Sequence, residues 1–213
     1  MHWSFVLLVL GAWATRKLPG DWFVWHVRIG YAIFVLAATR IVWGVLGTRY
    51  ARFADFVRGP SAVLHYLRGT AARHYAGHNP AGGWMVLLLL LLLLAQAVTG
   101  LFANDQISET GPLFGYVTLE RSDFLTSVHK VGFKVLQAAV ALHIAAVLFH
   151  LLVWRENLLR PMLDGAKSVD RVPQGASGID GSRAIRALVI AAIWGVALWW
   201  AVRTAPEASL FAF

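Results

Sequence analysis

Residues 83–102, GWMVLLLLLLLLAQAVTGLF, decide the fold of this chain. The stretch contains no charged residue, and leucine fills every position from 87 to 94. An α-helix needs roughly 20 apolar residues to cross about 30 Å of hydrocarbon. The stretch therefore predicts a membrane-spanning helix.

The rest of the chain has the same character. Of its 213 residues, 58% are hydrophobic and only 14% are charged, whereas soluble domains carry about 25% charged residues. Four further apolar segments lie at residues 3–14, 22–45, 131–154 and 187–202. We predict an all-α integral membrane protein with a four-helix core (residues 1–163), a cytoplasmic linker (164–186), and a fifth transmembrane helix with a C-terminal tail (187–213).

The loops between these segments differ in charge. The loop at residues 47–82 and the stretch from Arg155 to Arg186 are rich in arginine, whereas the loop between the third and fourth spans is acidic. Lysine and arginine stay on the cytoplasmic side during membrane insertion. We therefore expect a cytoplasmic N-terminus and a C-terminus on the outer side. The net charge of +8 follows from this topology and does not indicate a nucleic-acid partner.

The available metal ligands are few in kind. The chain has no cysteine, which excludes cysteine-ligated iron–sulfur clusters and covalent haem attachment through a C-x-x-C-H motif. It has three methionines, all near predicted helix ends, and eight histidines. Any metal chemistry must therefore rest on histidine or carboxylate ligands.

Two histidines lie on one face of the fourth span. His129 and His143 are fourteen residues apart, which places them within about 40° on a helix and separates them by about 21 Å along its axis. A histidine inside a membrane is costly and is a candidate functional residue. One face that presents histidines at two depths suits two stacked haems, each held between helices.

Each haem needs a second axial ligand at a matching depth. His26 lies near the outer end of the second span and pairs with His129 there. His2, at the inner end of the first span, is the predicted partner of His143. The alternative is His150, which lies within about 20° of the same face as His143. We interpret His150 instead as an interfacial residue near a propionate or a lipid headgroup.

Three basic residues lie close to these positions. Arg28 and Lys130 are near the outer ligands, where they either pair with haem propionates or extend to lipid headgroups. Arg40 is deeper in the second span, and an inner propionate is its expected partner. Small residues that allow a haem or a helix to approach closely are Gly30, Gly44, Gly100 and Gly132.

Several short motifs include these histidines or lie between them in the chain. They are His2-Trp3, the run from His26 through Gly30-Tyr31 to Arg40, Trp43-Gly44 and Gly47, ARFADF at 51–56, GHNPAGGW at 77–84, Thr99-Gly100, His129, His143, and RENL at 155–158. Over about residues 1–170 the chain resembles the bacterial cytochrome b561 family, which includes the b-type subunit of membrane-bound nickel–iron hydrogenases.

The resemblance implies a four-helix core in the bacterial inner membrane with two bis-histidine b haems. Their ligands would lie on the first, second and fourth spans. Such proteins exchange electrons between the quinone pool and a redox partner such as a c-type cytochrome, a dehydrogenase or a hydrogenase. An electron-transfer subunit is therefore the expected function, rather than a stand-alone enzyme.

Two other functions are possible for this sequence. A stand-alone superoxide:quinone oxidoreductase would use Arg28 and Lys130 to attract an anion, but the acidic third loop opposes such steering. A non-redox transporter would need discontinuous helices around a midplane site, and the spans of this chain read as continuous.

Overall fold

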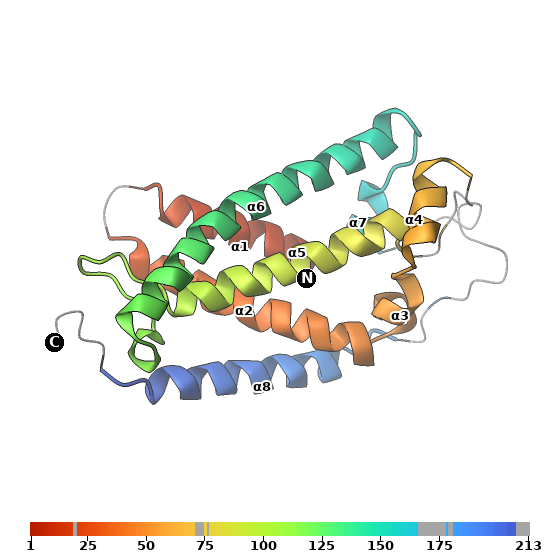
Figure 1. Ribbon diagram of the computed structural model, residues 1–213. Helices are drawn as coiled ribbons and strands as arrows, with labels where there is room; N and C mark the ends of the chain where they lie inside the picture. The colour runs from red at the N-terminus through yellow and green to blue at the C-terminus, as the bar shows by residue number, and fades with distance from the viewer. Residues whose placement is uncertain (19–20, 71–74, 76, 166–177, 179–180, 208–213) are drawn as a thin grey trace. The chain divides into compact units, whose positions relative to one another are not determined.

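The computed structural model describes residues 1–18, 21–70, 75, 77–165, 178 and 181–207, and within that part it contains helices and no β-strand. Figure 1 follows the chain from α1 in red to α8 in blue. The long helices are α1 (His2–Thr15), α2 (Phe23–Leu46), α5 (Pro80–Leu101), α6 (Leu119–Leu152) and α8 (Ala184–Arg203). Short helices are η1 (Arg49–Ala51), α3 (Phe53–Phe56), α4 (Pro60–Leu67), η2 (Phe114–Tyr116) and α7 (Leu159–Asp164). The predicted all-α fold class is confirmed.

Four of the described helices, α2, α5, α6 and α8, are long and apolar enough to cross a membrane. The first expected span, α1, is the remaining one. It is apolar but only 14 residues long, which is shorter than the roughly 20 residues of a full crossing. The predicted linker at 164–186 falls largely on residues 166–177, 179 and 180, which lie outside the described residues.

Helix α6 begins at Leu119, whereas the apolar pattern predicted a start at 131. Its first turns are polar, and their hydroxyl groups form hydrogen bonds within α6 and with residues 102–104. The Ser122 hydroxyl donates to the Phe102 carbonyl at 2.6 Å, and the Thr126 hydroxyl donates to the Ser122 carbonyl at 2.8 Å. The Asn104 amide in turn donates to Ser122 Oγ at 2.7 Å. His129 consequently lies well inside α6 rather than at its start.

The chain forms two compact units. Unit 1 consists of Met1–Arg40, Leu91–Leu136 and the chain from Leu188 onward, and unit 2 consists of Ile41–Leu90 and Gln137–Ala187. In unit 1, the buried residues Leu101, Leu113 and Leu198 pack together. The Tyr116 hydroxyl bonds to the Ala201 carbonyl at 3.1 Å. Helix α8 is therefore attached to unit 1 through both apolar packing and a hydrogen bond.

In unit 2 the motif at 51–56 packs against α2 on one side and against the motif at 77–84 on the other. A Cβ atom at Gly44 would overlap the Phe53 ring, and one at Gly83 would lie 2.8 Å from the Phe56 carbonyl oxygen. The Asn79 side chain accepts the Gly82 N–H at 2.7 Å, at the start of α5. These motifs therefore bring short helices against the ends of longer ones.

Candidate functional site

The structure brings His26 of α2 and His129 of α6 together in unit 1. Their ring centroids are 6.3 Å apart and the rings are nearly perpendicular, at 88°. Both side chains are partly buried. The outer pair that was predicted from depth alone is thus a pair of neighbouring imidazoles.

Both imidazoles are held in the same way, through Nδ1. The Nδ1 atom of His26 lies 3.0 Å from the Ala12 carbonyl oxygen, and that of His129 lies 2.9 Å from the Gln96 carbonyl oxygen. Because a carbonyl only accepts, Nδ1 carries the hydrogen and Nε2 keeps its lone pair. This tautomer is the one that binds a metal through Nε2, and a carbonyl partner at the other nitrogen is the usual support for such a ligand.

A threonine hydroxyl also lies near the Nδ1 atom of each ring. Thr15 Oγ1 lies 3.4 Å from His26 Nδ1, and Thr99 Oγ1 lies 3.3 Å from His129 Nδ1. Both hydroxyls donate to carbonyls of their own helices, Thr15 to Ala12 at 2.9 Å and Thr99 to Ala95 at 2.7 Å, so each oxygen faces its ring as an acceptor. In both helices the threonine follows the supporting carbonyl by three residues. Helices α1 and α5 therefore orient the two imidazoles by one shared arrangement.

Two further residues of α5 shape the position of His129. The Gln96 amide nitrogen lies 3.1 Å from His129 Nε2 and donates to the His129 carbonyl at 3.0 Å. Acceptance of this hydrogen by Nε2 agrees with the tautomer assigned above. A Cβ atom at Gly100 would lie only 2.9 Å from His129 Cε1. The small residue at position 100 therefore makes room for the ligand ring itself.

The predicted basic residues differ in exposure. The Arg28 guanidinium lies 5.0 Å from the Trp25 ring centroid, and both Arg28 and Lys130 are exposed. Arg40 is partly buried in α2. The structure adds Arg16, whose guanidinium lies 5.6 Å from the Phe23 ring, and Phe23 in turn stacks on His26 at 6.4 Å. Sequence reasoning missed Arg16 because it resembles an ordinary charge at a helix end.

The predicted inner ligands, His2 and His143, fall in different units. His2 is the first residue of α1 in unit 1, where its exposed ring lies edge-on to Trp3 with centroids 5.5 Å apart. His143 is partly buried in the part of α6 that belongs to unit 2. Because His2 and His143 belong to different units, the pairing of these two histidines stays a prediction.

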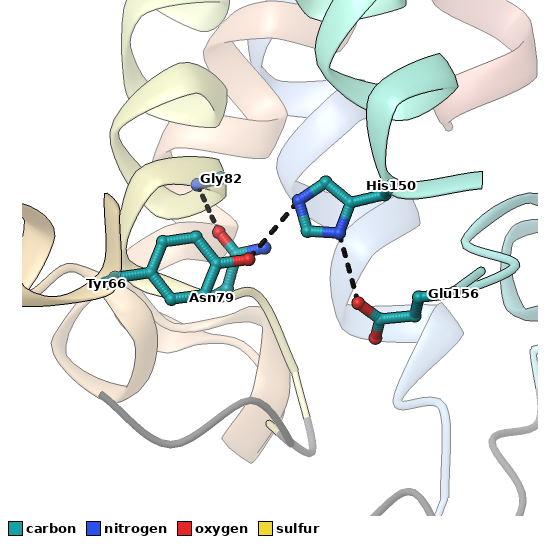
Figure 2. Close-up of polar contacts among 5 residues, drawn as sticks. All are labelled: Tyr66, Asn79, Gly82, His150 and Glu156. Carbon is teal, nitrogen blue, oxygen red and sulfur yellow. Dashed lines mark hydrogen bonds and ion pairs between the residues drawn. The ribbon is translucent and has the colours of Figure 1, made fainter. Parts of the chain in front are cut away.

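His150, which the sequence led us to interpret as an interfacial residue near a propionate or a lipid headgroup, is buried within unit 2. Only 8% of its surface is exposed. Its Nε2 atom lies 3.2 Å from the Tyr66 hydroxyl, and its Nδ1 atom lies 3.1 Å from Glu156 Oε2 (Figure 2). Both ring nitrogens therefore have partners within the protein, and no sequence pattern pointed to Tyr66 as one of them.

The outer pair fits a haem iron. Two imidazoles that bind opposite sides of one metal ion, with bonds of about 2 Å, have centroids roughly 6 Å apart, close to the spacing between His26 and His129. Among the described residues, no group of three or more histidine, aspartate or glutamate side chains is arranged so that it could hold a metal ion. The remaining ligands of an iron at this pair would therefore come from a macrocycle. A helical membrane protein with such a pair has the features of a b-type cytochrome.

Comparison with known families agrees with this class. The family model for prokaryotic cytochrome b561 matches residues 1–165. The chain belongs to the prokaryotic cytochrome b561 family, and it is a multi-pass membrane cytochrome of electron transfer that binds haem b. No curated protein and no solved structure matches it. The resemblance recognised in the sequence motifs is confirmed.

Proposed function

We propose that this protein carries two bis-histidine b haems and passes electrons between the quinone pool and a redox partner protein. The observation that carries the proposal is the matched support of His26 and His129, in which each Nδ1 atom bonds to a backbone carbonyl. Haem supplies one-electron redox chemistry when bound, and the protein supplies orientation and electrostatics.

The outer haem would be held by His26 and His129. The carbonyls of Ala12 and Gln96 hold the hydrogen of each ring on Nδ1, so that the lone pair that iron would bind is on Nε2. At His129 the Gln96 amide, 3.1 Å from Nε2, would give up its hydrogen bond to that atom. Arg16 lies beside this pair and is suited to a propionate, because arginine binds carboxylate groups through two parallel hydrogen bonds. Arg28 and Lys130 are exposed and lie close in the chain to His26 and His129, where they would serve either the second propionate or the lipid headgroups.

The inner haem would be held by His2 and His143. His2 is proposed as the fourth ligand because it lies at the inner end of the first span, at a depth that matches His143. Arg40 is partly buried in α2, and we propose that it pairs with an inner propionate, because arginine binds carboxylate groups through two parallel hydrogen bonds.

The acidic loop before α6 favours electron transfer to a partner protein. Asp105 Oδ1 accepts the N–H groups of Ile107, Ser108 and Glu109 at 2.8–2.9 Å. These hydrogen bonds, the one from Glu109 foremost, lower the pKa of Asp105. A carboxylate held ionised in this way suits a basic docking surface such as a c-type cytochrome or a dehydrogenase or hydrogenase subunit would present.

The same loop disfavours the alternative function, a superoxide:quinone oxidoreductase. Superoxide is an anion, and a negative loop repels it. We also propose that the protein resides in a bacterial inner membrane with its N-terminus in the cytoplasm and its C-terminus outside. The arginine-rich segments at 47–82 and after α6 support that orientation.

Haem content and quinone reactivity test the proposal. We expect a reduced-minus-oxidised spectrum of b type, about two haems per chain, and rapid reoxidation of the reduced protein by a soluble quinone. Purified protein that contains no haem after expression with adequate haem supply would refute it. Rapid consumption of superoxide without any partner protein would favour the alternative function.

The identity of the fourth ligand is a separate prediction. Replacing His2 with Ala should reduce the haem content to one per chain, whereas replacing His150 with Ala should leave both haems in place. The exposed His65 of α4 provides a matched control, since His65→Ala should also retain both. Loss of a haem from the His150 variant but not from the His2 variant would reverse the assignment.

A further inference from the structure

The side chain of Gln96 contacts the atom of His129 that iron would bind. Its amide nitrogen lies 3.1 Å from His129 Nε2 and 3.0 Å from the His129 carbonyl oxygen. A carbonyl oxygen only accepts hydrogen bonds, so the Gln96 atom beside it is the NH2 group, which has two hydrogens to donate. One hydrogen serves the carbonyl and the other serves Nε2. Since Nδ1 bonds to the Gln96 backbone carbonyl, one residue of α5 contacts both nitrogens of the ring.

Gly132 of α6 provides the space for this side chain. It lies about one helical turn after His129, on the same face of α6. A Cβ atom at Gly132 would lie 2.9 Å from Gln96 Oε1. A methyl group there would displace the end of the Gln96 side chain, because that end is more flexible than the helix backbone. The amide is therefore positioned by its two hydrogen bonds and by the small residue at position 132.

The two histidines of the outer pair differ at Nε2. Both are held at Nδ1 by a backbone carbonyl and a threonine hydroxyl. Within the described part of the chain, the hydrogen bonds of the His26 ring all involve Nδ1, and none reaches its Nε2 atom. The Nε2 lone pair of His26 is therefore available, whereas that of His129 is shared with Gln96.

An imidazole nitrogen has a single lone pair in the plane of the ring, so His129 Nε2 either accepts a hydrogen bond or binds iron. We propose that the Gln96 amide competes with haem iron for His129, so that His26 is the first of the two histidines to receive haem and the amide is displaced when His129 binds. The inference rests on the proposed function, in which this pair holds the outer haem. The iron–Nε2 bond forms as the N–H···N hydrogen bond breaks, and neither a proton nor an electron is transferred.

The expected size of this competition is modest. The net contribution of one hydrogen bond to a protein equilibrium corresponds to about 2- to 10-fold in the equilibrium constant. The bond from Gln96 to the His129 carbonyl does not involve the ring. The amide therefore stays beside Nε2 and forms its hydrogen bond again whenever iron leaves. We expect this return to lower the haem affinity of the outer site by about 2- to 10-fold.

Haem loss from the loaded protein is the first test, with the outer haem identified as the component that His129→Ala removes. We expect Gln96→Leu to transfer this haem to apomyoglobin about 2- to 10-fold more slowly than the parent protein. Gln137→Leu, the same exchange at an exposed position of α6, is the matched control and should equal the parent. The direction is decisive, because removal of a side chain that only held the ring in place would let the haem leave faster. Faster or unchanged haem loss from Gln96→Leu would overturn the inference.

Chemical modification of the full chain, produced without haem, is the second test. Diethyl pyrocarbonate reacts with an unshared imidazole lone pair, and ordinary histidines are neutral at about pH 8. Peptide mass spectrometry should show less modification of His129 than of His26. Gln96→Leu should raise the ratio of His129 to His26 modification by about 2- to 10-fold. Gly132→Ala, which displaces the amide without removing it, should act in the same direction.

Equal modification of the two histidines in the parent protein, or a ratio that neither variant changes, contradicts the competition. The two tests also separate this inference from the proposed function. If His129→Ala retains every haem of the parent, the proposed ligation fails and the inference fails with it. If that variant loses a haem but Gln96→Leu behaves as the parent does, only the inference fails.

Discussion

Replacing His129 with Ala is expected to lower the haem content of the purified protein from two per chain to one, with the outer haem lost. We propose His129 as one of the two ligands that would hold the outer haem, and the hydrogen bond from Nδ1 to the Gln96 carbonyl leaves the lone pair of its ring on Nε2. Alanine offers no replacement donor. The reduced-minus-oxidised spectrum should lose one of two b-type components, and a pyridine haemochrome assay should give the ratio of haem to protein.

Two further variants make this result specific. His26→Ala should remove the same spectral component, and the double variant should lose no more haem than either single variant, because ligands of one site act as a unit. Gln137→Ala, at an exposed position two turns beyond His129 on α6, should retain both haems. Loss of different components in the two single variants would contradict the pairing of His26 with His129.

Replacing Gly100 with Ala is expected to weaken binding of the outer haem by about 10- to 100-fold, the usual cost of disturbing the support of a metal ligand. The added Cβ atom would lie 2.9 Å from His129 Cε1. Since Thr99 and the Gln96 carbonyl hold the ring in place, it can move away only by losing those hydrogen bonds. Haem affinity is measured by transfer of the outer haem to apomyoglobin.

The control for this prediction is Gly195→Ala in α8, because nothing lies within 4 Å of a Cβ atom at Gly195. Alanine favours a helix over glycine by about 1 kcal/mol, so both variants gain similar intrinsic helix stability. Only the Gly100 variant should lose the outer haem faster. Equal rates of haem loss from the two variants would show that the ring at His129 adjusts freely.

The membrane spans and the outer pair were predictable because both depend on periodic features of the sequence. Apolar run length identifies α2, α5, α6 and α8, and the depth of a histidine within its span pairs His26 with His129. The early start of α6 was not predictable from hydropathy, since its first turns are polar and are stabilised by contacts such as that between Asn104 and Ser122.

Other features depend on contacts that a sequence pattern does not reveal. Ala12 and Gln96 act through backbone carbonyls, which every residue possesses, so their side chains give little signal. The shared spacing to Thr15 and Thr99 could have drawn attention to them. Tyr66 and His150 are 84 positions apart in the chain, and only the folded protein brings them into contact.

The position of each supporting carbonyl has a consequence for how the protein is made. Ala12 precedes His26 by one helix, and Gln96 precedes His129 by one helix. Each ligand is therefore aligned by the segment inserted just before it, and the outer site consists of two helical hairpins that are prepared separately. The hairpin of α1 and α2, which aligns His26, is complete while the ribosome is still translating α5 and α6. We accordingly expect that two fragments of this chain, divided between α4 and α5 and produced together, would assemble a competent outer centre.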